Sequence, residues 1–419
     1  MKKIVIAGAS TYGVKNHGDD AMFSNLVTQL QIKIPDCNIT LLARHPNEEF
    51  DSVFSVTSLK NFDHDSKKQS IGRWFYGFNP DDKRVHLNNV FQAIDDCDLL
   101  IIGGNALMEV STNDFLRGVA SYSALLVQIA KILQKPYVIY GMAVSPLENN
   151  YTKQIAKFIC ENATIVTVRE EFSKKNLINA EINDKNIYVL GDPVYGLEPT
   201  WNKNKAVEIL KNEKIIFRPD DNIIGIGFRS VYWTWKENEF NKYAKKMACL
   251  CDFMIENFNA RLLFIPNCTY NIDSPYEDDR IISESIKNQM KFDESAYILF
   301  DEYTLPEILS LFQLLKMHVS NRRHSCIFAA IHKIPFLAMS TEEKYVGPWH
   351  MKPFMEDLSV PNQGVSFTGE SLDFLTSKLN ETWENRATLS SELSKSIPPL
   401  KTRSQQYADL FCKILDNHN

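Results

Sequence analysis

Short apolar runs alternate with amphipathic segments along most of the chain. Residues 2–9, 98–102 and 137–140 are apolar runs of strand length, and each is followed by a segment with helical periodicity. Strands that are apolar on both sides are typical of parallel sheets that helices cover on both faces. The pattern therefore predicts an α/β protein built on parallel sheets.

This alternation occurs twice in the chain. The polar residues 199–221 separate the first series from a second one, which begins with the apolar run 223–228. We therefore predict an N-terminal Rossmann-like domain at residues 1–198, a linker at 199–221 and a C-terminal Rossmann-like domain at 222–419 with an amphipathic helical tail. A length of 419 residues suits two domains of about 100–200 residues each.

Two segments are predicted to be irregular. Residues 46–90 are polar and contain an aromatic cluster at 73–76. Such a segment fits a lid over a site, an insertion that binds an acceptor substrate, or a variable surface insertion. Residues 347–353 are predicted to form a loop.

Charge and cysteine content argue against several classes of protein. The net charge of −6, from 46 basic and 52 acidic residues, is unlike that of a general nucleic-acid binder. No apolar stretch has the length of a membrane span, and the first run is too short for a signal peptide, so we expect a cytoplasmic protein. The amphipathic tail leaves peripheral association with the inner face of the membrane open. The eight cysteines are scattered without CxxC spacing, so we expect reduced thiols and no metal site.

A basic triplet, Arg322, Arg323 and His324, stands where a loop becomes an apolar helical segment. The backbone N–H groups at a helix start are unpaired and favour anions, and guanidinium forks bind carboxylates and phosphates. His324 can hold a proton for donation. The alternative is a solvated basic loop that caps a buried helix, with Arg323 at the surface or at the fringe of a phosphate site.

Other polar and small residues follow strands of the predicted sheets. Sites in parallel sheets lie at the carboxyl ends of strands, where we place Asn16, His17, Asp19, Gly103, Gly104, Asn105, Ser145, Arg169 and Arg229. Three of them have structural alternatives. Asp19 or Asp20 suits a helix cap, His17 a solvent-facing loop, and Arg169 an interdomain ion pair.

These residues belong to motifs that resemble the polysaccharide pyruvyl transferase family, spread over nearly the full length. The matching motifs in chain order are Asn16-x-Gly18-Asp19-Asp20-Ala21, the strand 98–104 that ends in two glycines, Val168-Arg169-Glu170, Gly191-Asp192-Pro193, Arg229, Pro266 with Asp278 and Asp279, and Arg322-Arg323-His324-Ser325 with Ile327 and Ala329. Two positions depart from the family pattern, since Asn105 stands where glycine is usual and Arg323 where leucine is usual.

The resemblance implies two Rossmann-like halves in a GT-B-like arrangement with an interdomain cleft. It also implies transfer of the pyruvyl group of phosphoenolpyruvate to a sugar as a ketal, with release of phosphate and without a further cofactor. Arg229 and Arg322 suit the two anionic groups of the donor, His324 suits the acid and Asp19 the base, with Asn16 and His17 toward the acceptor. The acceptor sugar is lipid-linked, nucleotide-linked or polymeric.

Two other functions compete with this one. A GT-B-like glycosyltransferase would use the same basic loop for the diphosphate of a nucleotide sugar. A non-catalytic sugar- or anion-binding member of a polysaccharide system would retain the fold with a degraded site. A dehydrogenase is disfavoured, because no GxGxxG motif follows the first strand.

Overall fold

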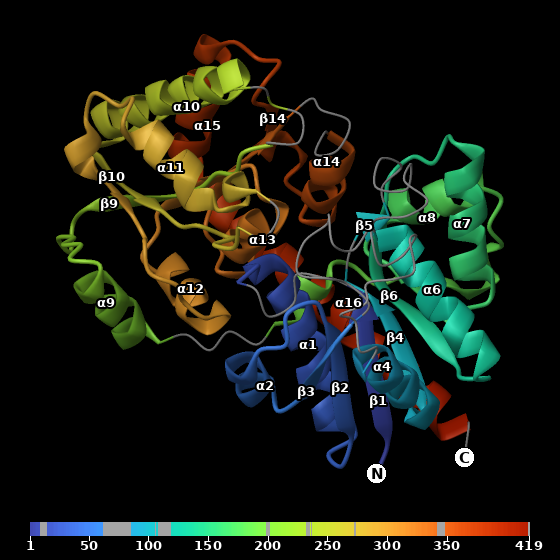
Figure 1. The fold of residues 1–419 in the computed structure, drawn as a ribbon. Coiled ribbons are helices and arrows are strands. Elements are labelled where there is room, and N and C mark those ends of the chain that lie inside the picture. Colours follow the sequence, from blue (N-terminus) through green and yellow to red (C-terminus); the bar gives the residue numbers. More distant parts are fainter. Residues whose placement is uncertain are drawn as a thin grey trace. The chain divides into compact units, whose positions relative to one another are not determined.

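The computed structural model forms two compact units. The first unit contains Met1–Val14, Asp19–Leu197 and Leu400–Asn419, and the second contains Lys15–Gly18 and Glu198–Pro399. The structure describes residues 1–8, 15–61, 85–104, 106–107, 119–197, 202–231, 235, 237–271, 274–341 and 348–417. Each unit is an α/β structure around one main sheet (Figure 1).

The first unit has a parallel sheet with the strand order β3-β2-β1-β4-β6-β7-β8, and the short β5 pairs with β6. These strands are β1 (Lys3–Gly8), β2 (Asn38–Ala43), β3 (Thr57–Lys60), β4 (Leu99–Gly103), β5 (Ala106–Leu107), β6 (Tyr137–Val144), β7 (Ile165–Val168) and β8 (Ile187–Val189). The order reverses between β1 and β4, as in doubly wound Rossmann folds.

Helices cover both faces of this sheet because its strands are apolar on both sides. They are α1 (His17–Lys33), α2 (Glu48–Phe54), α4 (Val85–Asp96), α6 (Val119–Ile132), α7 (Asn150–Glu161), α8 (Glu171–Asn179) and the end of α16 (Arg386–Asn417), with 3-10 turns η2 (Asp184–Asn186) and η3 (Pro193–Gly196). Leu126 of α6 and Ile159 of α7 belong to the core on one face. On the other face, Tyr140 donates a hydrogen bond to the Met22 carbonyl of α1 and packs against Tyr407 of α16.

The second unit repeats this topology in a parallel sheet with the order β11-β10-β9-β12-β13-β14. Its strands are β9 (Asn222–Gly227), β10 (Ala260–Phe264), β11 (Ala296–Ile298), β12 (Met317–Ser320), β13 (Phe336–Ser340) and β14 (Gly364–Ser366). Its helices are α9 (Lys203–Asn212), α10 (Glu237–Phe258), α11 (Asp279–Lys287), α12 (Leu305–Phe312), α13 (Arg323–Ile331), α14 (Pro348–Asp357), α15 (Leu372–Glu384) and the first part of α16, with 3-10 turns η4 (Pro275–Glu277), η5 (Asp293–Ser295) and η6 (Pro361–Gln363). In Figure 1, α10, α11 and α15 cover one face, and α9, α12 and α13 the other.

The predicted α/β class with two Rossmann-like halves is confirmed by these two sheets. The observed division of the chain differs from the predicted boundaries 1–198, 199–221 and 222–419. The end of α16 joins the first unit, where Tyr407 donates a hydrogen bond to the Gly191 carbonyl at 2.6 Å. Residues 15–18 and the predicted linker, which contains α9, join the second unit.

Several local predictions were wrong. Residues 48–54 and 57–60 of the supposedly irregular segment form α2 and β3, whereas its aromatic cluster at 73–76 lies outside the described residues. Part of the predicted loop 347–353 belongs to α14, because Pro348 suits the first position of a helix. Asp19 and Asp20 lie in the first turn of α1 rather than at its cap, because the helix begins at His17. None of the described helices is long and apolar enough to cross a membrane.

Candidate functional site

Most of the predicted residues of the second unit lie at the topological switch point of its sheet. Strands β9 and β12 are neighbours, and the order of the sheet reverses between them, so their carboxyl ends border the usual ligand crevice of an open α/β sheet. Arg229 follows β9, and Arg322 follows β12 as the N-cap residue of α13. The strand order thus brings together two arginines that are far apart in the sequence.

Hydrogen bonds tie these two strand ends to each other. The Arg229 N–H donates to Asn321 Oδ1 at 2.8 Å, and Asn321 Nδ2 donates to the Arg229 carbonyl at 3.0 Å. Ser320 Oγ donates to the Gly227 carbonyl at 2.5 Å and accepts from the Arg322 N–H at 2.9 Å. The backbones that carry the two arginines are therefore held in register.

Asp279 joins a third strand end to this group. Its Oδ2 accepts from the backbone N–H groups of Asn267 at 2.9 Å and Cys268 at 3.0 Å, in the loop after β10. Its Oδ1 accepts from Nη2 of Arg322. The carboxylate is almost fully buried and opens α11, where the helix dipole favours a negative charge. In the sequence, Asp279 belongs to a motif, but its spacing does not show which arginine it contacts.

The two arginines differ in their electrostatic surroundings. Burial disfavours the charge of Arg322, but the Asp279 carboxylate outweighs burial and raises the pKa of the guanidinium. Burial and repulsion from Arg322 lower the pKa of Arg229 to about 10. Nε of Arg322 is buried and has no hydrogen-bond partner among the described residues. Asp279 is thus the counterion of Arg322, and the two guanidiniums lie close enough to repel each other.

The segment Lys15–Gly18 reaches the same group of loops. Asn16 forms an antiparallel bridge with Cys268, the His17 N–H donates to the Asn267 carbonyl at 3.0 Å, and the Thr269 N–H donates to the Lys15 carbonyl at 3.3 Å. The pairing uses the loop whose N–H groups bind Asp279. The structure therefore brings Asn16 and His17 together with Arg229 and Arg322.

His17 is buried, with only 2% of its surface exposed, so its alternative interpretation as a solvent-facing residue is wrong. Burial, followed by the charges of Lys15 and Arg322, lowers the pKa of His17 to about 3, against a smaller opposing effect of Glu307. Its Nδ1 has no hydrogen-bond partner among the described residues. His17 is therefore neutral at physiological pH and has a ring nitrogen available for a ligand.

His324 lies in the first turn of α13 and packs directly against the backbone of this segment. A Cβ placed on Gly18 would lie 2.2 Å from Nδ1 of His324, so the ring occupies the space that any other residue at position 18 would need. Five of the predicted site residues thus form one constellation in the second unit: Asn16, His17, Arg229, Arg322 and His324.

Arg323 points elsewhere. Only 3% of it is exposed, and its guanidinium lies 5.5 Å from the ring centroid of Phe354 in α14. The interpretation as a surface residue is therefore wrong. The cation–π contact explains how an arginine is accommodated at a position where the family with similar motifs usually has leucine.

The predicted residues of the first unit have local structural surroundings. Nε of Arg169 donates to the Gly141 carbonyl at 2.7 Å, and its Nη1 lies 3.7 Å from Oδ2 of the buried Asp192. Both of these partners belong to the first unit, as Arg169 does. Ser145 is buried, and its Oγ donates to the Pro146 carbonyl at 3.0 Å.

Gly103 and Gly104 lie at the carboxyl end of β4, and Asp19 lies at the start of α1. Gly103 has a φ of 152°, and an added Cβ would lie 2.1 Å from the Tyr140 carbonyl oxygen. The Gly104 N–H donates to the same oxygen at 2.8 Å. The glycine pair thus serves the close approach of β4 to β6. Asp19 is half-buried in the first turn of α1, and Asn105 lies outside the described residues.

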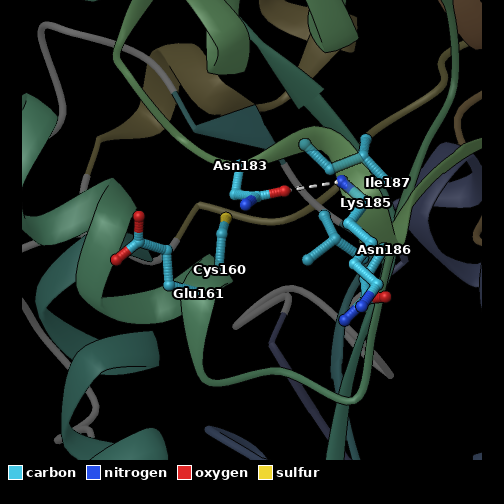
Figure 2. A pocket seen from close by; sticks show the side chains of 7 residues that line it. Cys160, Glu161, Asn183, Lys185, Asn186 and Ile187 are labelled. Carbon is cyan, nitrogen blue, oxygen red and sulfur yellow. Dashed lines mark hydrogen bonds between the residues drawn. The ribbon is translucent and has the colours of Figure 1, made fainter.

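A separate cavity of about 300 Å³ lies in the first unit (Figure 2). Its lining comes from α7, η2 and the strands β7 and β8: Cys160, Glu161, Val166, Asn183, Lys185, Asn186 and Ile187. None of the predicted site residues lines it. Burial, with a smaller effect of Glu161, raises the pKa of the Cys160 thiol to about 12, so this cysteine is not a nucleophile at neutral pH. Within the described ranges, no cluster of three or more His, Cys, Asp or Glu residues could hold a metal ion.

Comparisons with known proteins agree with the sequence motifs. A family model described as polysaccharide pyruvyl transferase matches residues 16–343. The amylovoran biosynthesis protein AmsJ of Erwinia amylovora is 20% identical over 431 residues, which cover 94% of this chain and 95% of that protein.

Solved structures share the fold at low identity. Alr3699/HepE of Anabaena in complex with UDP-glucose has a TM-score of 0.61 at 12% identity, over 99% of this chain and 100% of that one. A putative UDP-N-acetylglucosamine 2-epimerase from Listeria monocytogenes has a TM-score of 0.61 at 10% identity, over 97% of this chain and 94% of that one.

Proposed function

The chain belongs to the polysaccharide pyruvyl transferase family, and we propose that it moves the pyruvyl group of phosphoenolpyruvate onto a sugar of a surface polysaccharide or its precursor, as a ketal. The observation that carries the proposal is the pair of arginines at the switch point of the second sheet, Arg229 and Arg322, which lie close enough for their mutual repulsion to lower the pKa of Arg229. Phosphoenolpyruvate carries a carboxylate and a phosphate on a small frame, so it suits two cationic groups that approach from different strands.

The donor would lie against the start of α13. Nη2 of Arg322 is engaged by Asp279, whereas its buried Nε has no partner among the described residues and can donate to an oxyanion. The N-terminal N–H groups of a helix add to the attraction for a phosphate. Arg229 is held by Asn321 on the neighbouring strand end and would bind the second anionic group.

The reaction needs an acid that protonates the methylene carbon of the donor. Protonation leaves an oxocarbenium-like carbon, which a sugar hydroxyl attacks with loss of its proton. A second hydroxyl then displaces phosphate and closes the ketal. His17 is an unsuitable acid, since its pKa of about 3 leaves it neutral. We assign the proton transfer to His324 at the start of α13 and the role of neutral hydrogen-bonding residue to His17.

The acceptor is assigned to the loop that precedes α1 and to the first turn of this helix. Asp19 is half-buried in that turn and is the proposed base for the attacking hydroxyl. Asn16, fixed by its bridge to Cys268, is the proposed ligand of a sugar hydroxyl. Asp19→Asn should lower kcat and leave the affinity for phosphoenolpyruvate unchanged. Product formation and phosphoenolpyruvate binding, measured on the same sample, test this prediction.

The proposal is tested by thermal unfolding with and without phosphoenolpyruvate. A ligand at 100 times its Kd adds about 2.7 kcal/mol of stability, which corresponds to a rise in Tm of roughly 5–10 °C for units of this size. Arg322→Lys keeps a charge beside Asp279 but loses the guanidinium fork, so the shift should largely disappear. Arg261→Ala is the matched control, because this arginine lies in β10 and bonds Ser295 at 3.2 Å instead of Asp279; its shift should equal that of the wild type.

Activity completes the test, since phosphate should be released only when donor and a suitable sugar are both present. A nucleotide-sugar glycosyltransferase is the second candidate, because HepE has the same fold and its structure contains UDP-glucose. Stabilisation by UDP-glucose with none by phosphoenolpyruvate would replace the proposal with that function. The absence of stabilisation by either, together with no phosphate release, would instead favour a non-catalytic member of the family.

A further inference from the structure

Gly18 is in unusually close contact with the proposed acid. A Cβ at this position would lie 2.2 Å from Nδ1, 2.9 Å from Cγ and 3.1 Å from Cβ of His324. Real Cβ atoms do not approach other heavy atoms this closely, so an alanine at position 18 and the present ring position of His324 exclude each other.

The backbone itself does not require glycine at this position. Gly18 lies in the first turn of α1, and it is absent from the residues with positive φ. A glycine inside a helix costs about 0.5–1 kcal/mol relative to alanine because it loses more conformational entropy. The contact with His324 is therefore the feature that accounts for a glycine here.

The segment that carries Gly18 is anchored to the same loops as the arginines. Asn16 pairs with Cys268 and the His17 N–H bonds the Asn267 carbonyl. Asp279 binds the N–H groups of these two loop residues and also Arg322. The clash caused by an added methyl group at position 18 thus cannot be relieved easily by a shift of the segment. The ring of His324 has to move instead.

We infer that Gly18 is a positioning residue that sets the ring of His324 with its Nδ1 edge against the backbone of α1 and presents Nε2 to the donor. The inference rests on the proposed function, since it concerns the proton that His324 delivers. Proton transfer depends steeply on geometry, and a displacement of about 1 Å can cost roughly 100-fold in rate. Gly18 therefore controls the chemical step and leaves donor binding to the arginines.

The test compares Gly18→Ala with the wild type in kcat and in thermal stabilisation by phosphoenolpyruvate. We expect kcat to fall by roughly 100-fold, while the concentration of phosphoenolpyruvate that gives half of the stabilisation stays within about twofold. Gly369→Ala is the control, because this glycine is exposed in a turn of the same unit and should retain wild-type kcat. Unchanged kcat in Gly18→Ala would overturn the inference, as would equal losses of kcat and donor affinity.

A double variant separates action through His324 from a general structural effect. If Gly18 acts only through this ring, Gly18→Ala combined with His324→Ala should be no slower than His324→Ala alone. If the double variant instead lost kcat by the product of the two single-variant factors, the inference would be contradicted. If Gly18→Ala alone fails to fold, the double variant should regain folding, because the clash is gone, and failure of both to fold would again refute it. Absence of donor binding in the wild type would instead refute the proposed function.

Discussion

The same pair of residue types, an arginine beside a buried aspartate, occurs in two different chemical settings. Arg169 donates through Nε to the Gly141 carbonyl and lies beside Asp192. Arg322 contacts Asp279 through Nη2, but its buried Nε has no partner among the described residues. Nε of Arg169 thus donates its hydrogen bond within the protein, whereas the Nε–H of Arg322 can still donate a hydrogen bond to a ligand. The two arginines therefore differ in whether the protein itself occupies Nε.

Replacement of Arg169 should therefore affect stability and leave donor binding unchanged. Arg169→Met leaves the Asp192 carboxylate buried without this partner, which should lower the free energy of unfolding by about 3–5 kcal/mol. Urea denaturation measures the loss, and the half-saturating concentration of phosphoenolpyruvate should stay at the wild-type value. Adding Asp192→Asn removes the buried negative charge that Arg169 faced and should restore part of the stability. A variant with full stability and lost donor binding would show that Arg169 is a ligand residue.

At the scale of elements, strand ends and loops determine which side chains meet. The carboxyl ends of β9, β10 and β12 supply Arg229, the 267–269 loop and Arg322, and the segment Lys15–Gly18 pairs with that loop. In the first unit, Gly103 at the end of β4 serves strand packing, since its backbone lies against the Tyr140 carbonyl of β6. Glycine at a strand end is thus a sign of close approach, and the neighbour decides whether a ligand or another strand approaches.

Gly103→Ala tests this structural role. A left-handed backbone costs about 1–3 kcal/mol for a residue with a side chain, and overpacking adds about 1–3 kcal/mol. We expect a loss of roughly 2–6 kcal/mol in the free energy of unfolding, measured by urea denaturation, or failure to fold. The exposed Gly369→Ala serves again as control, with a change within about 0.5 kcal/mol. If Gly103→Ala kept full stability and lost only activity, the glycine would instead be required by the ligand.

At the scale of the whole molecule, buried neutral histidines couple stability to pH. His17 is buried at the site, and His318 is fully buried in β12 with Nε2 at 2.8 Å from Ser325 Oγ. Burial lowers the pKa of each to about 3. Below pH 6.5 the unfolded chain takes up a proton at each histidine, while the folded chain does so only near pH 3. The stabilisation is therefore complete above pH 6.5 and is lost as the pH falls toward 3.

Each such histidine should contribute about 1.4 kcal/mol per pH unit below 6.5. Urea denaturation should thus give a free energy of unfolding about 2–3 kcal/mol lower at pH 5.5 than at pH 7.5 from these two groups. In His17→Gln the difference should shrink by about 1.4 kcal/mol, and the same should hold for His318→Gln. A pH dependence that neither substitution changes would show that these histidines take up protons in the folded state.

Sequence patterns were sufficient for the class of the fold. Strands that are apolar on both sides indicate parallel sheets, and this local signal predicted most strands of both units. The basic triplet at a loop-to-helix junction also placed Arg322 at the start of α13. Segments with weak or mixed patterns were predicted less well, since α2, α9 and α14 are short helices within polar sequence. Such helices gain their stability from packing, which periodicity alone does not contain.

The sequence by itself thus determined the alternation of strands and helices and the presence of arginines and a histidine where a loop becomes a helix. Tertiary structure alone decided which of them meet. Arg322 and Arg323 are neighbours in the chain, yet one binds Asp279 and the other packs on Phe354, because successive residues at a helix start point in different directions. Gly18 and His324 are far apart in the chain and in contact in the fold. Distant contacts depend on the order of strands in a sheet, and each strand is specified locally, without reference to its neighbours.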